Sequence, residues 1–460
     1  MRASVIFESP RRWSWLPLAF GLWAAAIALS PQWTGKAILA APAVLIPLLI
    51  WTLAKPSRWI VLFLGSALLL PPLPIPIGDS GPHPGLIFAA IGLFAGMLRA
   101  REWQWTGQSP ARPFVALLGV LLASVGAAAV YSGEIAAAGS LARVLLFAIA
   151  VYLYFYSSCG PWREPVNLRP LYWTAIIAAL FACVDFYYQF PAPAGYGPQF
   201  VWLDSGVYRR AQGLFYEAST LGNFCAFFLV MIAVAFSRPR TESPVSRAGL
   251  ATGAAVLMAA LVLSYSRASL ITVAIAIAVL VWRNRTRVPL AKAAVLASAG
   301  ALAMWWIFPI FVQAWWMRIS ASAEYFFTAT EGVLSGRVAS WRTLLAWIES
   351  HPWQMLFGIG YKTLPYTSQL GAPVVADNMY LSLLVETGIA GLAALIWLNV
   401  AILRAAGQAS RSSNTQRAFC GMWMLCFWAG EVVQMASGDL LTYWRVLPVY
   451  FFVLALAVRR

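Results

Sequence analysis

The most unusual residues of this chain are ionisable side chains inside or beside long apolar segments. The stretch VADNMYLSLLVETGIAGL, residues 375–392, has the apolar run of a membrane helix, yet it opens on Asp377 and Asn378 and carries Glu386. Only 16 of the 460 residues are acidic. Asp377 would make a good helix N-cap, because the helix dipole favours a carboxylate there. An ionised Asp377 beside cations would also be placed to accept a proton from a hydroxyl group.

Arginine side chains also stand where a membrane segment rarely tolerates charge. Arg209 and Arg210 precede the apolar stretch QGLFYEASTLGNF, which carries Glu217. Guanidinium forks neutralise phosphate through paired hydrogen bonds, so this pair suits a diphosphate at membrane depth. The alternative is a pair of cations that snorkel to the membrane surface. We expect Glu217 to pair with one of the two arginines, and contact with a substrate is its alternative role.

Two further arginines are candidates for anion binding. Arg267 lies in the short connection LSYSRAS between two apolar segments, with Ser266 beside it. An anionic ligand near a helix start explains this charge better than a helix cap or an interfacial side chain does. Arg337 begins a predicted helix, where the dipole would favour an acid, and a solvated loop charge is the alternative.

Other buried charges are expected to be structural. Glu386 follows Asp377 by nine residues, roughly 180° around a helix, so the two carboxylates should face opposite ways. We therefore expect Glu386 to bond a neighbouring helix rather than to join Asp377 in a catalytic pair. Arg143 and Arg445, which lie deep in apolar segments, are expected to pair with acids on adjacent helices.

The composition indicates the fold class. Of the 460 residues, 61% are hydrophobic and 10% are charged. Apolar runs of about 18 residues or more recur, each long enough to cross a bilayer. We expect an all-α, polytopic membrane protein with about 12–14 transmembrane helices, forming one integral membrane domain over residues 1–460. The predicted spans are 14–30, 37–54, 59–71, 85–98, 113–131, 139–157, 171–189, 214–236, 248–263, 268–282, 293–311, 378–403, 419–435 and 442–458.

The basic residues follow the membrane topology. The net charge is +16, but most of the 32 Lys and Arg residues fall in alternate connections between spans, which is the positive-inside pattern. This pattern places both termini in the cytoplasm and argues against nucleic acid as a partner. The basic residues that it leaves unexplained are Lys36, Arg143, Arg209, Arg210, Arg267, Arg318, Arg337, Arg342, Lys362 and Arg445.

The long connection 312–377 is the main segment outside the predicted spans, and loops of this length are usually functional or disordered. Within it, SGRVASWRTLLAWIES, residues 335–350, is predicted to form an amphipathic helix that lies in the membrane interface. Its apolar face would carry Trp341, Leu344, Leu345 and Ile348.

The unexplained charges are expected to gather on one side of the membrane, because ionisable groups at membrane depth are costly and usually functional. The residues that could face a common outer cavity are Arg209, Arg210, Arg267, Arg337 and Asp377, with Asp79 and Arg143. The five cysteines lie in or beside spans, so we expect no disulfide framework. Two histidines argue against a histidine-built metal site.

Four motifs in order carry a resemblance to a known family. They are RRAQGLFYEASTLGNF, LSYSRASL, SGRVASWRTLLAWIESHPWQMLFGIGY and DNMYLSLLVETGIAGL, covering roughly residues 205–395. Together they resemble the O-antigen ligase and polymerase superfamily, the membrane glycosyltransferases of bacterial surface polysaccharides. The family pattern places R-x-x-G-x-F, S-R, G-R-x-x-x-W and an Asp-Asn or His-Asn helix in this sequence order.

The resemblance implies a GT-C-like transferase of the bacterial inner membrane that works on the periplasmic face. It would take a glycan from an undecaprenyl diphosphate donor and join it to an acceptor hydroxyl, without a nucleotide sugar, a metal or another cofactor. Membrane lipids would surround it. Arg210 or Arg209, Arg267 and Arg337 would hold the diphosphate, and Asp377 would be the base of an inverting attack. Further substrate contacts would come from Glu217, Ser266, Asn378 and Tyr380.

The resemblance also bears on the type of transfer. Ligases that join O-antigen to lipid A-core usually have His where Asp377 stands. Asp-Asn, together with Glu217 in FYEAS, is more similar to exopolysaccharide polymerases, whose acceptor is another lipid-linked repeat unit. We therefore expect a polymerase, with a ligase as the alternative. A lipid-linked oligosaccharide flippase is the non-enzymatic alternative, although its basic residues would line a path reachable from both sides.

Overall fold

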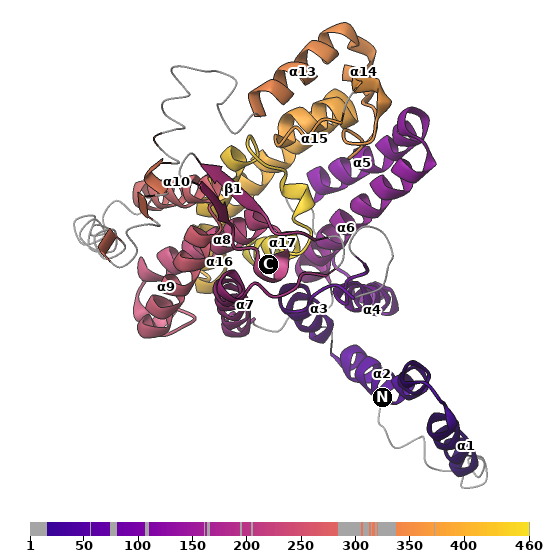
Figure 1. Ribbon diagram of the computed structural model, residues 1–460. Helices are drawn as coiled ribbons and strands as arrows, with labels where there is room; N and C mark the ends of the chain where they lie inside the picture. Colours follow the sequence, from indigo (N-terminus) through magenta and orange to yellow (C-terminus); the bar gives the residue numbers. More distant parts are fainter. Residues whose placement is uncertain are drawn as a thin grey trace. The chain divides into compact units, whose positions relative to one another are not determined.

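The computed structural model describes residues 16–55, 57–73, 81–105, 110–160, 162, 166–193, 196–203, 206–283, 305–306, 312–313, 315–317, 320, 337–371 and 373–459 (Figure 1). The predicted span 293–311 and Asp79 lie outside the described residues, apart from residues 305–306. The chain falls into two compact units, Met1–Trp59 and Ile60–Arg460.

The first unit holds two helices, α1 (Leu16–Leu29) and α2 (Trp33–Ala54). They contact each other, and Trp23 Nε1 donates to the Leu39 carbonyl at 2.8 Å. Both coincide with predicted spans.

The second unit is built almost entirely of helices. After α3 (Arg58–Leu69), which begins at the end of the first unit, come α4 (Gly85–Leu98), α5 (Ala111–Ser132), α6 (Glu134–Cys159), α7 (Arg169–Tyr188), α8 (Ala218–Phe236), α9 (Arg247–Leu263), α10 (Arg267–Arg283), α13 (Arg337–Ser350), α14 (Pro352–Phe357), α15 (Met379–Ala409), α16 (Thr415–Gln434) and α17 (Leu447–Val458). Short 3-10 turns are η2 (Ala100–Glu102), η3 (Gly213–Phe215), η4 (Arg240–Glu242), η6 (Ser368–Leu370) and η7 (Leu440–Thr442).

The only sheet among the described residues is a hairpin of β1 (Phe200–Leu203) and β2 (Gly206–Arg209). The strands are antiparallel, with Phe200 opposite Arg209. This hairpin leads the chain into η3 and then into α8.

The predicted fold class, an all-α polytopic membrane protein, is confirmed. Every predicted span other than 293–311 coincides with a helix. By length and composition, five helices in the described part of the chain are long and apolar enough to cross a membrane: Ala111–Ser132, Glu134–Cys159, Arg169–Tyr188, Ala218–Phe236 and Met379–Ala409. All five cysteines are free thiols.

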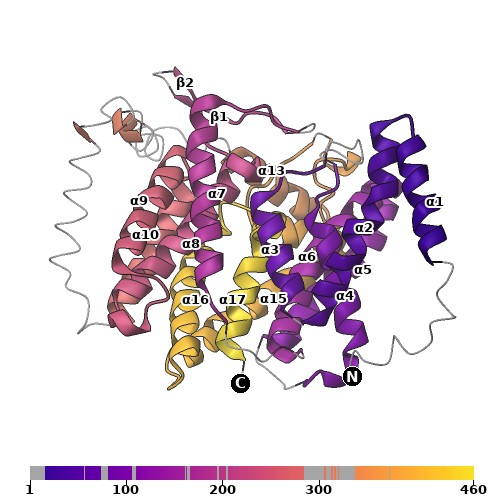
Figure 2. The same cartoon turned by 90° about the horizontal axis from the view of Figure 1, so that it is seen from below.

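The core of the second unit lies around α8, which packs against α16, while α16 and α15 both contact α17 (Figure 2). The ring of Phe227 lies 4.3 Å from that of Trp423 and 4.4 Å from that of Tyr450, centroid to centroid. Such aromatic contacts fill the space between three helices.

A chain of hydrogen bonds that includes the buried acid Glu431 crosses the same core. Asn223 Nδ2 donates to Glu431 Oε2 at 2.6 Å, and the Tyr450 hydroxyl donates to Asn223 Oδ1 at 2.5 Å. Since an unbonded polar group costs several kcal/mol in an apolar medium, this chain of hydrogen bonds makes the burial of Glu431 tolerable.

The helix α15 is broken at Gly388, and the break joins it to the preceding loop. Gly388 has a φ of 72° and a ψ of −170°, which no helix contains. The loop Gly358–Ile359–Gly360 fills the gap: Ile359 N donates to the Val385 carbonyl at 3.2 Å and Gly360 N to the Glu386 carbonyl at 2.8 Å. The glycines are required because a Cβ on Gly358 would lie 2.3 Å from the Glu386 carbonyl oxygen.

Arg445 anchors the end of α3 instead of pairing with an acid, so the prediction of an acidic partner is wrong. Its guanidinium donates to the carbonyls of Ala67 and Leu70, both at 2.7 Å, and to that of Leu214. The last carbonyls of a helix have no partner within the helix, and a guanidinium supplies donors for them.

His83 completes the same anchor. Its Nε2 lies 2.9 Å from the Leu70 carbonyl oxygen, and its Nδ1 accepts from Gly85 N at 3.0 Å, so the ring is neutral with the proton on Nε2. Burial, reinforced by the nearby Arg445 cation, lowers the pKa of His83 from 6.5 to about 4.

Gly388→Ala should destabilise the second unit by about 1–3 kcal/mol, because a non-glycine residue is strained at this φ. The new Cβ would also lie 2.2 Å from the Leu356 carbonyl oxygen. Thermal unfolding of purified protein in detergent measures the effect. Gly126→Ala is the matched control, since a Cβ there meets nothing within 4 Å. Equal midpoints for the two variants would contradict the role of the break.

The His83 anchor should make stability depend on pH. Between pH 6.5 and about 4 the unfolded chain binds a proton that folded His83 does not, so stability falls as the pH drops through this window. We expect the unfolding midpoint to fall further from pH 7 to pH 5 in the wild type than in His83→Gln. Parallel pH profiles for the two proteins would show that His83 does not titrate in this way.

Candidate functional site

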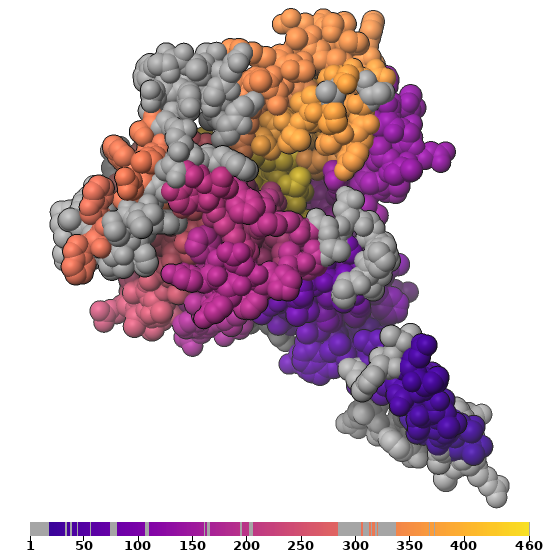
Figure 3. Space-filling model, viewed as in Figure 1, coloured from indigo at the N-terminus to yellow at the C-terminus, as the bar shows by residue number. Residues whose placement is uncertain are grey.

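A cavity of about 470 Å³ lies where several segments far apart in the sequence meet. Figure 3 shows a recess between the magenta and the orange parts of the second unit, with yellow C-terminal residues at its base. The residues that line the cavity are Gln199, Arg210, Glu217, Ser219, Tyr265, Ser266, Arg267, Ala268, Arg337, Lys362, Leu364, Pro365, Val374, Val375, Ala376, Asp377, Ser382, Glu386, Gln434, Ser437, Gly438, Asp439, Thr442 and Tyr443.

Three arginines line this cavity: Arg210, Arg267 and Arg337. Arg210 is fixed by its backbone N–H, which donates to the Gln199 carbonyl at 2.8 Å, and by its Nε, which donates to the Ser264 carbonyl at 2.8 Å. Arg267 is the first residue of α10, and Arg337 is the first residue of α13. The end of the hairpin and the starts of two helices therefore place three guanidinium groups around the same cavity.

The charges of these arginines affect one another. Burial lowers the pKa of the Arg210 guanidinium; Tyr443 and Glu217 raise it, and the cations Arg337 and Arg267 lower it. Guanidinium groups stay protonated in proteins even so. Like charges held together are stabilised by an anion, so this end of the cavity is suited to a phosphate or diphosphate group.

Arg209 does not line the cavity, in contrast to the prediction. It is the last residue of β2, and neighbouring side chains of an extended chain point to opposite sides. Its Nη2 lies 3.7 Å from Oδ2 of Asp185 on α7, so Arg209 fixes the hairpin to that helix. Of the two neighbouring arginines, Arg210 is the one that faces the cavity.

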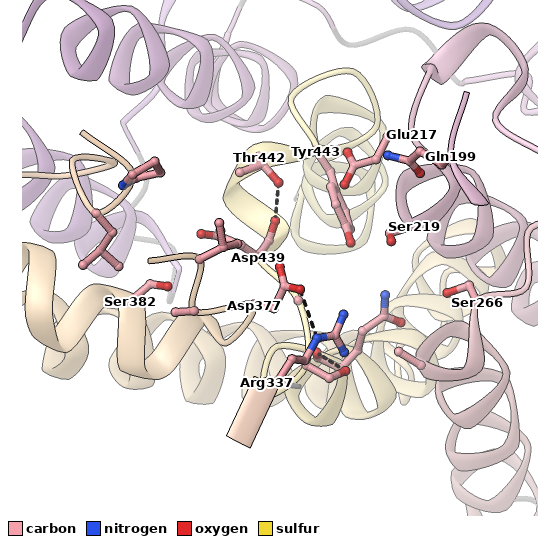
Figure 4. Close-up of a pocket in the computed structure, with 18 of the residues that line it drawn as sticks. Gln199, Glu217, Ser219, Ser266, Arg337, Asp377, Ser382, Asp439, Thr442 and Tyr443 are labelled. Atoms are coloured by element: carbon pink, nitrogen blue, oxygen red, sulfur yellow. Dashed lines mark hydrogen bonds and ion pairs between the residues drawn. The ribbon is translucent and has the colours of Figure 1, made fainter. Parts of the chain in front are cut away.

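Asp377 lies between the arginines and the start of α15. Its φ is 44°, in the left-handed region. Its Oδ2 accepts a hydrogen bond from Arg337 Nε at 3.0 Å, and its side chain is 47% exposed, which leaves the carboxylate accessible to a substrate (Figure 4). Trp341 Nε1 donates to the Ala376 carbonyl at 2.6 Å, which holds α13 against this segment.

The N-cap of α15 is Asn378, not Asp377. The Asn378 Oδ1 accepts from Leu381 N at 3.1 Å, so the carboxylate of Asp377 is not used for capping. Tyr380 likewise turns away from the cavity, and its hydroxyl donates to the Val432 carbonyl at 2.7 Å. Both residues, predicted as substrate contacts, hold α15 in place and are not among the residues that line the cavity.

Glu217 and Ser266 line the cavity. The expected ion pair of Glu217 with Arg209 or Arg210 is not found among the described residues, and Thr220 is its hydrogen-bond partner instead. Glu217 is the N-cap residue of α8, and its Oε2 accepts from the Thr220 hydroxyl at 2.6 Å. Ser266 Oγ lies 2.8 Å from Ser269 Oγ. Arg143, in contrast, does not line the cavity.

The helix α13, predicted to lie in the membrane interface, packs one face on protein. Its residues Leu344, Trp347 and Ile348 are buried in a cluster with Ile359, Leu364, Val374, Ala376 and Val385. Leu345, predicted on the apolar face, is 50% exposed. The helix is therefore a support for the loop that carries Asp377.

A second charged group, missed from the sequence, lines the same cavity. Lys362 Nζ forms an ion pair with Asp439 Oδ2, and Asp439 Oδ1 accepts from Leu441 N at 3.0 Å. Burial lowers the pKa of Lys362, but the carboxylates of Asp439 and Glu386 outweigh it and raise that pKa above its ordinary value. Lys362 stood among the basic residues that topology leaves unexplained, whereas no motif marked Asp439.

Glu386 belongs to this group, so the prediction that it faces away from Asp377 is wrong. Both carboxylates line one cavity. The expected rotation of about 180° around a helix between the two residues does not apply. The helix α15 begins only at Met379, and the backbone of Asp377 is in the left-handed region. Glu386 Oε1 accepts weakly from Leu364 N at 3.4 Å, which ties α15 to the loop after Gly360.

Among the described residues, no three His, Cys, Asp or Glu side chains lie close enough together to hold a metal ion. The polar side chains that line the cavity include cations, carboxylates and hydroxyls. Such a set can bind an anion at one end and exchange protons with a hydroxyl group beside it.

Comparison with known proteins matches part of this chain. Residues 251–396 match the family model described as O-antigen ligase. The matched range includes Arg267, Arg337, Asp377 and the broken turn of α15. A search of curated proteins found no match.

Arg210→Gln should weaken the binding of inorganic diphosphate to the purified protein. A hydrogen bond to a charged group contributes about 1.5–3 kcal/mol, which is roughly a 10-fold to 100-fold change in Kd. Arg342→Gln is the matched control, because Arg342 is exposed on α13 outside the cavity. Isothermal titration calorimetry compares the two. Equal losses of affinity, or none in Arg210→Gln, would exclude Arg210 from an anion site.

Proposed function

We propose that this chain, whose residues 251–396 match the family model described as O-antigen ligase, polymerises undecaprenyl-diphosphate-linked oligosaccharide repeat units. The enzyme transfers the growing glycan from one lipid-linked donor to a hydroxyl of another repeat unit. The product is an exopolysaccharide or O-antigen polymer.

The observation that carries this proposal is the convergence of Arg210, Arg267, Arg337 and Asp377 on one cavity. Arg210 and Arg267 hold the diphosphate of the donor. As the bond between C1 of the sugar and the diphosphate breaks, negative charge grows on the leaving group, and preorganised guanidinium groups stabilise it. The starts of α8, α10 and α15 also meet here, and helix N-termini favour anions.

Asp377 is the base in this mechanism. Its carboxylate takes the proton from the acceptor hydroxyl as the new C–O bond forms at C1, and the configuration of C1 is inverted. Arg337 orients the carboxylate through its ion pair at 3.0 Å, and the cap by Asn378 fixes the backbone behind it. The diphosphate leaves with the electrons of the broken bond.

The direction of the helices supports a periplasmic cavity in the inner membrane. Glu217, Arg267 and Asp377 lie at the N-terminal ends of α8, α10 and α15. The basic residues Arg238, Arg283 and Arg411 lie at the C-terminal ends of the same helices, and the positive-inside rule assigns these ends, like both termini, to the cytoplasm. A cavity at one end of its helices favours an enzyme over a flippase.

Two features favour a polymerase over a ligase. The residue at the base position is Asp377 instead of His, and Glu217 stands in FYEAS at the entry of α8. Ligation of glycan to lipid A-core remains the alternative transfer, with the same donor chemistry and a different acceptor.

Replacing Asp377 by Asn in the native strain should abolish polymer and accumulate lipid-linked repeat units, because the amide cannot accept the proton. Gel analysis of the polysaccharide and mass spectrometry of the lipid fraction measure both, with immunoblotting of the membrane level. Glu349→Gln, an exposed acid outside the cavity on α13, is the control and should leave polymer unchanged.

Two outcomes would change the assignment. Normal polymer with normal attachment in Asp377→Asn would remove Asp377 from the chemistry. Normal polymer that is no longer attached to lipid A-core would identify the protein as a ligase instead.

A further inference from the structure

The cavity has two chemically different ends. Figure 4 shows Asp377 between Ser382 on one side and Glu217, Ser219 and Ser266 on the other. Arg210 and Arg267 belong to the Ser266 end, since Arg210 Nε bonds the Ser264 carbonyl and Arg267 follows Ser266.

The opposite end is formed by Lys362, Asp439 and Glu386. Lys362 and Asp439 form an ion pair with side chains that are 13% and 14% exposed, and Glu386 is 2% exposed. Glu386 lies one helical turn after Ser382, on α15. Oε2 of Glu386 is buried with no hydrogen-bond partner among the described residues, an arrangement that costs free energy unless a ligand or a change of position satisfies it.

The backbone at this end is strained. Lys362 has a φ of 58°, and two other non-glycine residues that line the cavity, Tyr265 and Asp377, have φ values of 52° and 44°. Left-handed conformations of such residues are strained and concentrate at functional sites. The turn at Lys362 is held by the contact of Gly360 with α15.

The charge of this end does not suit the donor diphosphate. Asp439 neutralises Lys362, so this pair offers no net positive charge that would attract a diphosphate. Carboxylates accept hydrogen bonds and an ammonium donates them, while sugar hydroxyls do both. This end is therefore matched to a polyhydroxylated sugar.

Resting on the proposed function, we propose that Lys362, Asp439 and Glu386 form the subsite for the acceptor sugar. An inverting attack brings the acceptor hydroxyl to C1 from the face opposite the leaving group. With the diphosphate at Arg210 and Arg267, and the base Asp377 between the two ends, the acceptor sugar lies against Lys362 and Asp439. These residues bind and select the acceptor sugar, while Asp377 accepts the proton of its hydroxyl group.

Separate donor and acceptor substrates test this assignment. The donor is a lipid-linked repeat unit whose acceptor hydroxyl is blocked, and the acceptor is a repeat-unit glycoside without a diphosphate. Initial rates in detergent or nanodiscs then give a separate KM for each. Asp439→Asn is the first variant, because Asn can still accept the hydrogen bond from Leu441 N.

We expect Asp439→Asn and Lys362→Gln each to raise the KM for the acceptor by about tenfold or more, since each removes a charged hydrogen-bonding group. The KM for the donor should change less than about twofold. Arg210→Gln should show the reverse pattern. A single variant leaves its partner as an unpaired buried charge and could therefore fail to fold. In that case the double variant Lys362→Gln/Asp439→Asn is tested, because it removes both charges together.

An unchanged acceptor KM in the folded variants would overturn the subsite. A rise in the donor KM alone, or a loss of kcat at constant KM, would also overturn it. If the wild type transfers no glycan from the blocked donor to any acceptor, the proposed function itself fails. The two failures are therefore distinguishable.

Discussion

The contact between the loop Gly358–Ile359–Gly360 and the broken turn of α15 positions the acidic part of the cavity. Two backbone hydrogen bonds replace the helical ones lost at Gly388. The loop is also wedged against α5, where a Cβ on Gly360 would lie 2.4 Å from the Ala128 Cα. Because no larger residue fits at these glycines, the turn that follows is fixed, and with it Lys362 and Glu386.

Charge at membrane depth is tolerated in this protein through two kinds of partner. Arg445 satisfies carbonyls at the end of α3, and Glu431 is bonded through Asn223 to Tyr450. The cavity differs from these closed networks, because its arginines and Asp377 face a space large enough for a ligand. That difference separates the charges that stabilise the fold from those that we propose to act on a substrate.

Much of this organisation could be predicted from the sequence. The lengths of the apolar segments predicted the helices in their order along the chain. The rarity of charge in such segments marked Arg210, Arg267, Arg337 and Asp377. Asp439 was missed because its partner Lys362 lies 77 positions away and no local pattern joins them. The position of Glu386 was mispredicted because a helical rotation was applied across the left-handed Asp377. The hairpin that turns Arg209 away from the cavity was not predicted either.

The most direct test of the account is an experimental structure with an unreactive donor, in which a CH₂ group replaces the oxygen between C1 and the diphosphate. The account expects the diphosphate between the guanidinium groups of Arg210 and Arg267, with C1 facing Asp377. A diphosphate bound at Lys362, or outside the cavity, would contradict it.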